Sequence, residues 1–230
     1  GLQFGSIATY LDLPRKSFIY DLLTDVSSMD EQAFQQALTP YKDKMSVFTA
    51  PADVLPLDLI GPEEVTALLK LARSTFDIVI VDMPGTLTSW TDTVLTEADM
   101  FYLVCELEVR SAQNALRFQK LLQAEGIPSN SLAYILNRAP GKMDLTGRSR
   151  IEKMSESLDV KFQAVLPDGG RQVTDSNDLA HMLRDSMPRA PLTKEIAKFA
   201  QEIAEARTRI EAGEAARPAK KKSFFGLNFG

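Results

Sequence analysis

The run Phe-Asp-Ile-Val-Ile-Val-Asp at residues 76–82 restricts the possible folds more than any other part of this sequence. β-branched residues favour strands, and the run lacks the polar alternation of a strand that has one face in water. Such a strand is typical of a parallel sheet covered by helices on both faces. We therefore predict a buried strand that ends at Asp82.

Further short apolar runs alternate with stretches of helical periodicity along the chain. One helix is predicted to begin near Pro62, and another spans about 111–124 before Gly126. A long apolar stripe between Leu192 and Ile210 predicts a final helix. The other predicted strands are residues 47–49, 101–105, 132–136 and 160–166. Alternating strands and helices form right-handed βαβ units, so the fold class is α/β, doubly wound, with a mostly parallel sheet and helices on both faces.

The bulk composition suits one domain with a sizeable core. The chain has 230 residues, of which 44% are hydrophobic and 25% charged. Its net charge of −5 argues against a dedicated nucleic-acid binder, whose domain is normally basic. The single cysteine, Cys105, excludes an internal disulfide framework and fits a reducing compartment. No apolar run approaches the roughly 18 residues that span a bilayer.

The last residues differ in composition from the rest. We predict a domain over residues 1–212 and a flexible linker with a basic-aromatic tail over 213–230, where three lysines, 220–222, precede Phe224 and Phe225. Lysines near an anionic membrane each contribute about 1 kcal/mol, so residues 219–230 could make reversible membrane contact. A solvated tail without that function is an equally good interpretation.

Ligands of open parallel sheets bind at the carboxyl ends of the strands. The residues there are Asp82, Glu106, Asn137 with Arg138, and Pro167 with Asp168. An aspartate at the tip of a buried strand can hold the magnesium ion of a bound nucleotide. It can equally cap a turn or a helix, and the local pattern leaves both interpretations open.

A nucleotide site also needs a glycine-rich loop that holds the phosphates. The pattern G-x-x-x-x-G-K-[ST] does not occur in these residues, and Gly141-Lys142 is followed by methionine in place of the hydroxyl residue. His181 is the only histidine, so the sequence has few side chains that could form a metal cluster or a nucleophile–histidine pair. The phosphate-binding part of a nucleotide site is therefore absent from this sequence.

Several segments together resemble the ParA/MinD superfamily of deviant-Walker ATPases, in particular its CpaE/TadZ pilus-assembly branch. Leu-Gln-Phe-Gly at residues 2–5 is similar to the segment that follows the second strand in that branch, and residues 76–84 are similar to the Walker B strand and switch. Asn137-Arg138 resembles the family's N-R motif, and the stretch Val-Leu-Pro-Asp at 165–168 resembles its I-P-x-D element. The resemblance covers most of residues 2–210.

The resemblance implies a P-loop NTPase-like fold whose first strand and phosphate loop precede residue 1. It implies ATP and Mg²⁺ as cofactors, with Asp82 near the metal and with Asn137, Arg138, Pro167 and Asp168 around the base. It further implies a homodimer that organises a Flp or type IVb pilus machine with other pilus-assembly proteins. The expected location is cytoplasmic, or peripheral at the inner membrane or cell pole.

Two other functions compete with this expectation. A nucleotide-free scaffold would use the same fold only for protein contacts, and the missing phosphate loop favours it. A partitioning or positioning ATPase that acts on DNA is disfavoured by the acidic charge balance. ATPase activity is expected only if a phosphate loop is supplied upstream.

Overall fold

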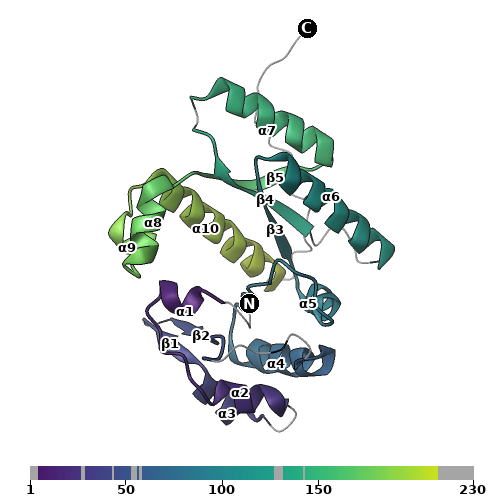
Figure 1. Cartoon of the computed structure of the whole chain (residues 1–230), viewed down its shortest axis with the longest axis vertical. Helices are drawn as coiled ribbons and strands as arrows, with labels where there is room; N and C mark the ends of the chain where they lie inside the picture. Colours follow the sequence, from purple (N-terminus) through teal and green to yellow (C-terminus); the bar gives the residue numbers. More distant parts are fainter. Residues whose placement is uncertain are drawn as a thin grey trace.

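The fold is built around a parallel sheet of three strands, β3 (Phe101–Glu106), β4 (Leu132–Ala139) and β5 (Phe162–Pro167), in the order β3-β4-β5. The computed structural model describes residues 5–26, 29–42, 44–52, 56, 59–126, 132–141 and 143–211. Two crossover helices, α6 (Val109–Ala124) and α7 (Leu145–Leu158), connect the strands. Figure 1 shows the sheet with these helices in the upper half of the molecule.

Helices cover this sheet on both faces, as predicted. On one face Cys105, Tyr134 and Leu136 pack with residues of α6 and α7 in a buried core. On the other face lies α10 (Pro191–Glu211), whose Phe199 ring meets Tyr102 edge-on with centroids 5.1 Å apart. Alternate strand residues point to opposite faces, so this sheet has the two apolar sides of a helix-covered parallel sheet.

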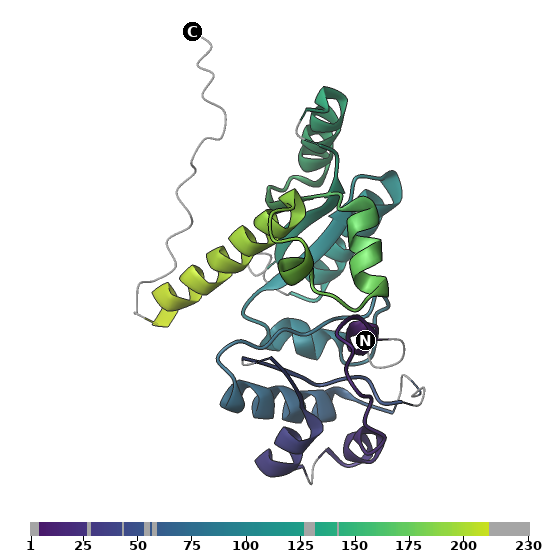
Figure 2. The ribbon, with the colours of Figure 1, turned by 90° about the vertical axis from the view of Figure 1, so that its left-hand side faces the viewer.

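The earlier part of the chain forms a mostly helical region with two short strands, in the lower half of Figures 1 and 2. Its core joins Ile19, Leu23 and Val26 to Val65, Trp90 and Val94. A neighbouring cluster contains Met29, Phe34 and Leu38, and Phe48 and Leu68 contact both clusters. The elements of this region are α1 (Ile7–Tyr10), α2 (Ile19–Thr24), α3 (Glu31–Ala37), β1 (Thr39–Tyr41), β2 (Met45–Val47), α4 (Pro62–Thr75) and α5 (Thr91–Glu97).

The predicted strand at residues 47–49 is wrong in its extent and in its partner. Only Val47 is part of a strand, β2, which pairs antiparallel with β1. Thr39 lies opposite Val47 in this hairpin. The hairpin satisfies the backbone locally, so the segment does not join the parallel sheet.

The predicted strand at residues 76–82 is also wrong, because in this structure the segment is not part of any sheet. An apolar run becomes a strand only when a neighbouring chain accepts and donates its backbone hydrogen bonds. Among the described residues, no backbone hydrogen bond joins residues 78–81 to another segment. Ile78, Val79, Ile80 and Val81 are consequently exposed rather than buried.

The remaining helices complete the C-terminal part of the described chain. They are α8 (Gly170–Asp178), α9 (Leu183–Ser186) and α10, which extends beyond the sheet in the side view of Figure 2. Lys42 near the β1–β2 turn forms an ion pair with Asp185 on α9, and Arg207 on α10 lies 3.8 Å from Asp77. No helix among the described residues combines the length and the apolar character needed to cross a membrane. Residues 213–230, where the tail is predicted, lie outside the described residues.

Cys105 is expected to react with thiol reagents only when the sheet unfolds. Its side chain is 2% exposed in the core of the sheet, and burial raises the pKa of the thiol, while a hydrogen bond with Ser111 partly opposes that shift. Because the thiolate is the reactive form, we expect labelling at neutral pH to be at least about 100-fold slower in the native protein than in denaturant. Mass-spectrometric labelling with iodoacetamide measures this. Equal rates in both conditions would contradict the buried position.

Candidate functional site

The carboxyl ends of the three parallel strands meet at one edge of the sheet. Glu106 at the end of β3 lies opposite Asn137 on β4, and Ala139 lies opposite Pro167 on β5. The Asp168 N–H donates to the Ala139 carbonyl at 3.0 Å, which fixes the loop after β5 against β4. The expectation that residues after separate strands would gather at this edge is confirmed for these positions.

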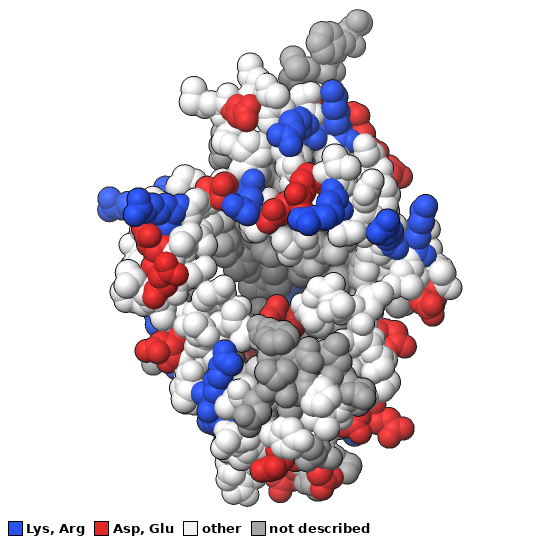
Figure 3. Space-filling model, in the orientation of Figure 1, with Lys and Arg blue, Asp and Glu red and all other residues white. Residues whose placement is uncertain are grey.

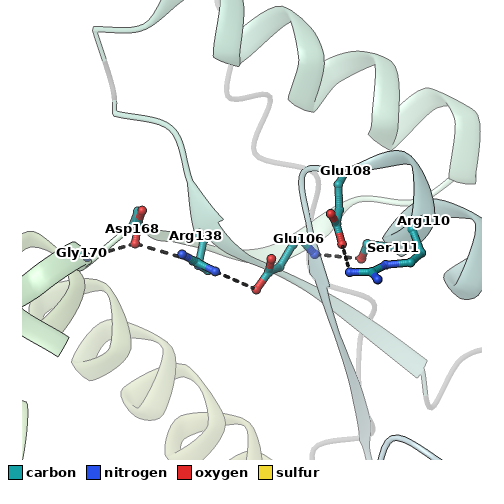
Figure 4. A network of polar contacts seen from close by, with 7 residues as sticks. All are labelled: Glu106, Glu108, Arg110, Ser111, Arg138, Asp168 and Gly170. Carbon is teal, nitrogen blue, oxygen red and sulfur yellow. Dashed lines mark hydrogen bonds and ion pairs between the residues drawn. The ribbon is translucent and has the colours of Figure 1, made fainter. Parts of the chain in front are cut away.

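An arginine between two carboxylates dominates this edge (Figure 4). Arg138 Nη1 lies 3.8 Å from Glu106 Oε1, and Arg138 Nε lies 3.8 Å from Asp168 Oδ1. The guanidinium group therefore bridges the ends of β3 and β5. Both distances exceed those of ordinary hydrogen bonds, so these groups attract one another while their hydrogen-bonding positions stay available to a ligand.

The backbone of Arg138 has a left-handed conformation, with φ of 52°. The pairing of β4 with β5 shifts its register between Leu136 and Ala139, around this residue. A non-glycine residue in this conformation costs on the order of 1–3 kcal/mol, and such strain concentrates at functional sites. The irregularity turns the end of β4 and aims the guanidinium group between its two carboxylates.

The carboxylate of Asp168 is held from a second side. Gly170 at the start of α8 donates its backbone N–H to Asp168 Oδ1 at 3.0 Å. The N-terminus of a helix favours negative charge, because its first N–H groups lack helical partners. Asp168 thus has a fixed orientation, with oxygen lone pairs left for a donor on a ligand.

A pocket of about 580 Å³ opens beside this ion-pair network. Its described lining includes four carboxylates and two guanidinium groups, so these residues together carry a net negative charge. Carboxylates accept hydrogen bonds from amino groups, and an arginine plane stacks on aromatic rings. The lining residues can therefore accept hydrogen bonds from amino groups and contact a flat ring, and their net negative charge disfavours a triphosphate. The lining residues are Glu106, Leu107, Glu108, Arg138, Ala139, Pro140, Gly141, Asp144, Arg150, Pro167 and Asp168.

The far wall of the pocket comes from the start of α7. Asp144 caps this helix, because its Oδ1 accepts from the Gly147 N–H at 2.8 Å. A Cβ atom added at Gly147 would lie 2.4 Å from Pro140 Cγ, so only glycine lets the helix approach the loop this closely. Arg150 on α7 donates to the Leu107 carbonyl at 2.9 Å and joins this wall to the end of β3.

The structure brings together some of the predicted site residues and leaves others apart. Arg138, Pro167 and Asp168 line the pocket, whereas Asn137 is half-buried in β4 and Asp82 is not among the lining residues. Among the described residues, no group of three or more His, Cys, Asp or Glu side chains could hold a metal ion. The role of Asp82 beside a nucleotide-bound magnesium ion stays a prediction.

Four charged residues beside or within the pocket were not predicted: Glu108, Arg110, Asp144 and Arg150. Glu108 and Asp144 are the residues immediately before α6 and α7, whereas Arg110 lies in the first turn of α6 and Arg150 in the second turn of α7. Arg110 Nη2 donates to Glu108 Oε1 at 3.2 Å, and both lie beside Glu106 (Figure 4). Because helices in βαβ units begin at the carboxyl edge, their first residues were the available signal.

Comparison with known proteins finds ATPases of the ParA and MinD kind. No protein-family model matches the chain. The septum site-determining protein MinD of Thermotoga maritima is 24% identical over 145 residues, which are 62% of this chain and 54% of that protein. The chain thus spans about half the length of this curated relative.

Solved structures of such ATPases match a larger share of this chain than the curated relative does. A ParA family ATPase from Chlorobium tepidum superposes with a TM-score of 0.77 at 21% identity, over 87% of this chain and 82% of that one. A chain of the MinC:MinD cell division complex of Aquifex aeolicus gives 0.68 at 19% identity, over 88% and 81%. The cell division ATPase MinD of Pyrococcus furiosus gives 0.62 at 18%, over 89% and 82%.

These three superpositions cover 87%, 88% and 89% of this chain. The chain therefore has the α/β fold of the ParA and MinD ATPases, a parallel sheet with flanking helices.

Proposed function

We propose that this chain forms the base-binding side of an ATP-dependent positioning protein of the ParA/MinD type. The observation that carries the proposal is the clamp of Arg138 between Glu106 and Asp168 beside the pocket. The carboxylates would accept a hydrogen bond from the amino group of adenine, and the guanidinium plane would contact the ring. Triphosphate and magnesium would be held by residues other than those that line this pocket.

The finer proposal is a CpaE/TadZ-type protein that organises a Flp or type IVb pilus machine. Its support is the resemblance of the sequence at residues 2–13 to that branch, together with the similar segments at 137–138 and 165–168. In this role the protein would act as a homodimer with other pilus-assembly proteins. It would work in the cytoplasm or at the inner surface of the membrane, which residues 219–230 would contact through lysines and aromatic rings.

A nucleotide-free scaffold is the second candidate, and the acidic balance of the described lining favours it. A ligand with several phosphates would be repelled by four carboxylates unless other residues compensated them. The same fold would then act only through contacts with proteins. A DNA-binding role has less support, because lysines, arginines and acidic side chains are interspersed on the face shown in Figure 3.

Replacing Arg138 by asparagine in the full-length protein is expected to weaken ATP binding by about 10- to 100-fold. Asparagine tolerates the left-handed backbone of this position, so the change removes the guanidinium group without adding backbone strain. Asp168→Asn is expected to have a similar effect and to reduce the preference for ATP over GTP. Isothermal titration calorimetry with magnesium and each nucleotide measures both effects.

Arg171→Ala is the matched control for these variants. Arg171 is an exposed arginine on α8 that pairs with Asp175 at 3.8 Å and does not line the pocket. It should leave the affinity for ATP unchanged. Wild-type protein that binds no nucleotide would favour the scaffold, and equal binding by Arg138→Asn and wild type would place the base elsewhere.

A further inference from the structure

The crossover helix α6 differs in charge from the other long helices of the described chain. Of the five described helices with more than eight residues, α4, α7, α8 and α10 each contain Asp or Glu, and α6 contains neither. The chain as a whole has 31 acidic and 26 basic residues, so an acid-free helix stands out. The helix dipole does not account for it, because the dipole favours acidic side chains in the first turn, where α6 has Arg110.

The cations of α6 share one side of the helix. Arg110, Arg117 and Lys120 are separated by seven and three residues, which places them on the same helix face, and all three are exposed. The opposite side packs on the sheet. There Ala115 belongs to the buried core, and the Phe118 ring stacks on a phenylalanine of β3 with centroids 5.4 Å apart. The cations therefore point away from the sheet beside which α6 lies in Figure 1.

Amide side chains lie between these cations. Gln113 and Asn114 are exposed on the same side of the helix, in the turn after Arg110. Arg110 Nη2 lies 3.2 Å from a carboxylate oxygen of the glutamate that precedes α6, whereas Arg117 and Lys120 form no ion pair with another described residue. We call these five residues the α6 basic face. It offers many hydrogen-bond donors and two cations that have no partner within the described residues.

We propose that the α6 basic face binds an acidic helix of a partner protein. Its cations extend over about 15 Å along the helix axis. A helix that carries Asp or Glu side chains seven and three residues apart presents carboxylates at the same spacing, so each cation can meet one carboxylate in a charge-assisted hydrogen bond. The amides of Gln113 and Asn114 add neutral hydrogen bonds between these pairs. The proposal does not depend on nucleotide binding.

The size and composition of the face favour an acidic helix over nucleic acid or lipid. A DNA duplex carries one charge per about 1.7 Å of its axis and extends beyond a face of this length. Acidic side chains lie among the basic ones across the view in Figure 3, so a longer anionic polymer would meet repulsive charges. Stable binding to a membrane surface also needs apolar side chains that enter it, and the α6 basic face contains none.

The test uses a fluorescein-labelled helical peptide of alanine and glutamate, whose glutamates have the spacing of the three cations. Its binding to the full chain is followed by fluorescence anisotropy at low salt. We expect Arg117→Glu combined with Lys120→Glu to weaken binding at least about tenfold, because attraction is replaced by repulsion. Arg117→Gln combined with Lys120→Gln adds no acidic group to the helix and should weaken binding at least about threefold.

A matched control reverses two cations on other helices. Arg171→Glu combined with Lys198→Glu changes the net charge by the same amount, at exposed positions of α8 and α10. This variant should bind the peptide as the wild type does. A second peptide of the same composition, with its glutamates distributed around the helix, should bind the wild type more weakly than the first. Circular dichroism of each variant checks that the fold is retained.

Three outcomes would overturn the proposal. The first is that the wild type does not bind the peptide, or that reversing Arg117 and Lys120 leaves the affinity unchanged. The second is equal binding of the two peptides, because the spacing of the carboxylates would then be irrelevant. The third is tighter binding of a short DNA duplex or of phosphatidylglycerol vesicles than of the peptide, lost in the same variant, which would assign the face to nucleic acid or to a membrane.

Discussion

Replacing Leu136 by alanine is expected to lower the free energy of unfolding by about 2–5 kcal/mol. Leu136 lies in the middle strand of the parallel sheet, is 0% exposed, and packs in the core with Cys105, Tyr134 and Met154. The change removes buried apolar atoms and leaves a cavity that neighbouring strands and helices cannot fill without moving. Urea denaturation, followed through the accessibility of the Cys105 thiol, measures the loss.

Val165→Ala is the matched control in the same sheet. Val165 on β5 is 41% exposed, so truncating it removes far less buried surface and should cost less than about 1 kcal/mol. Equal effects of the two substitutions would mean that β4 is not the centre of the core. Such a result would also weaken the assignment of the pocket to a rigid sheet edge.

The same physical reasoning explains which strands were predictable. The apolar runs at 101–105, 132–136 and 160–166 correspond to β3, β4 and β5, because their neighbours are supplied by adjacent βαβ units. The run at 76–82 has the strongest strand composition of all, yet it is not part of a strand in the described structure. The composition of a segment shows that it can be extended and buried. The hydrogen-bonding partners of its backbone, however, come from elsewhere in the chain or from another polypeptide.

The β1–β2 hairpin is the opposite case, because its strands pair although the sequence did not predict the pairing. Its first strand, Thr39–Tyr41, contains Pro40, which cannot donate to a ladder, and no apolar alternation marks it. The pairing depends on the turn around Lys42, whose φ is 51°. Between Tyr41 and Met45 the sequence has Asp43 as its one typical turn residue, and no apolar alternation flanks it, so the local pattern does not predict a hairpin.

The gathering of these charged residues at one sheet edge was predictable, and their contacts were only partly so. Topology places the ends of parallel strands at one edge, which is sufficient to bring Glu106, Arg138 and Asp168 together. The left-handed backbone of Arg138 and the bridging geometry follow from the register shift of β4 against β5. That shift depends on the packing of the whole sheet, so no local sequence pattern predicts it.

Leu23→Ala is expected to destabilise the N-terminal region by about 2–5 kcal/mol and to leave the sheet almost unaffected. Leu23 on α2 is 0% exposed and belongs to the core that also contains Trp90. Trp90 is the single tryptophan of the chain, so its fluorescence reports on this core, as the labelling of Cys105 reports on the core of the sheet. Urea unfolding followed by both probes in one sample separates the two responses.

The expected separation follows from how the cores are connected. The two N-terminal clusters share Phe48 and Leu68, whereas the core of the sheet shares no residue with either among the described residues. Solvent-exposed ion pairs such as Lys42 with Asp185 contribute little to cooperativity. Leu23→Ala should therefore lower the urea midpoint of the Trp90 signal and not that of Cys105, and Leu136→Ala should do the reverse. Equal shifts of both midpoints would show a single cooperative unit, which would require an apolar connection between the regions beyond these clusters.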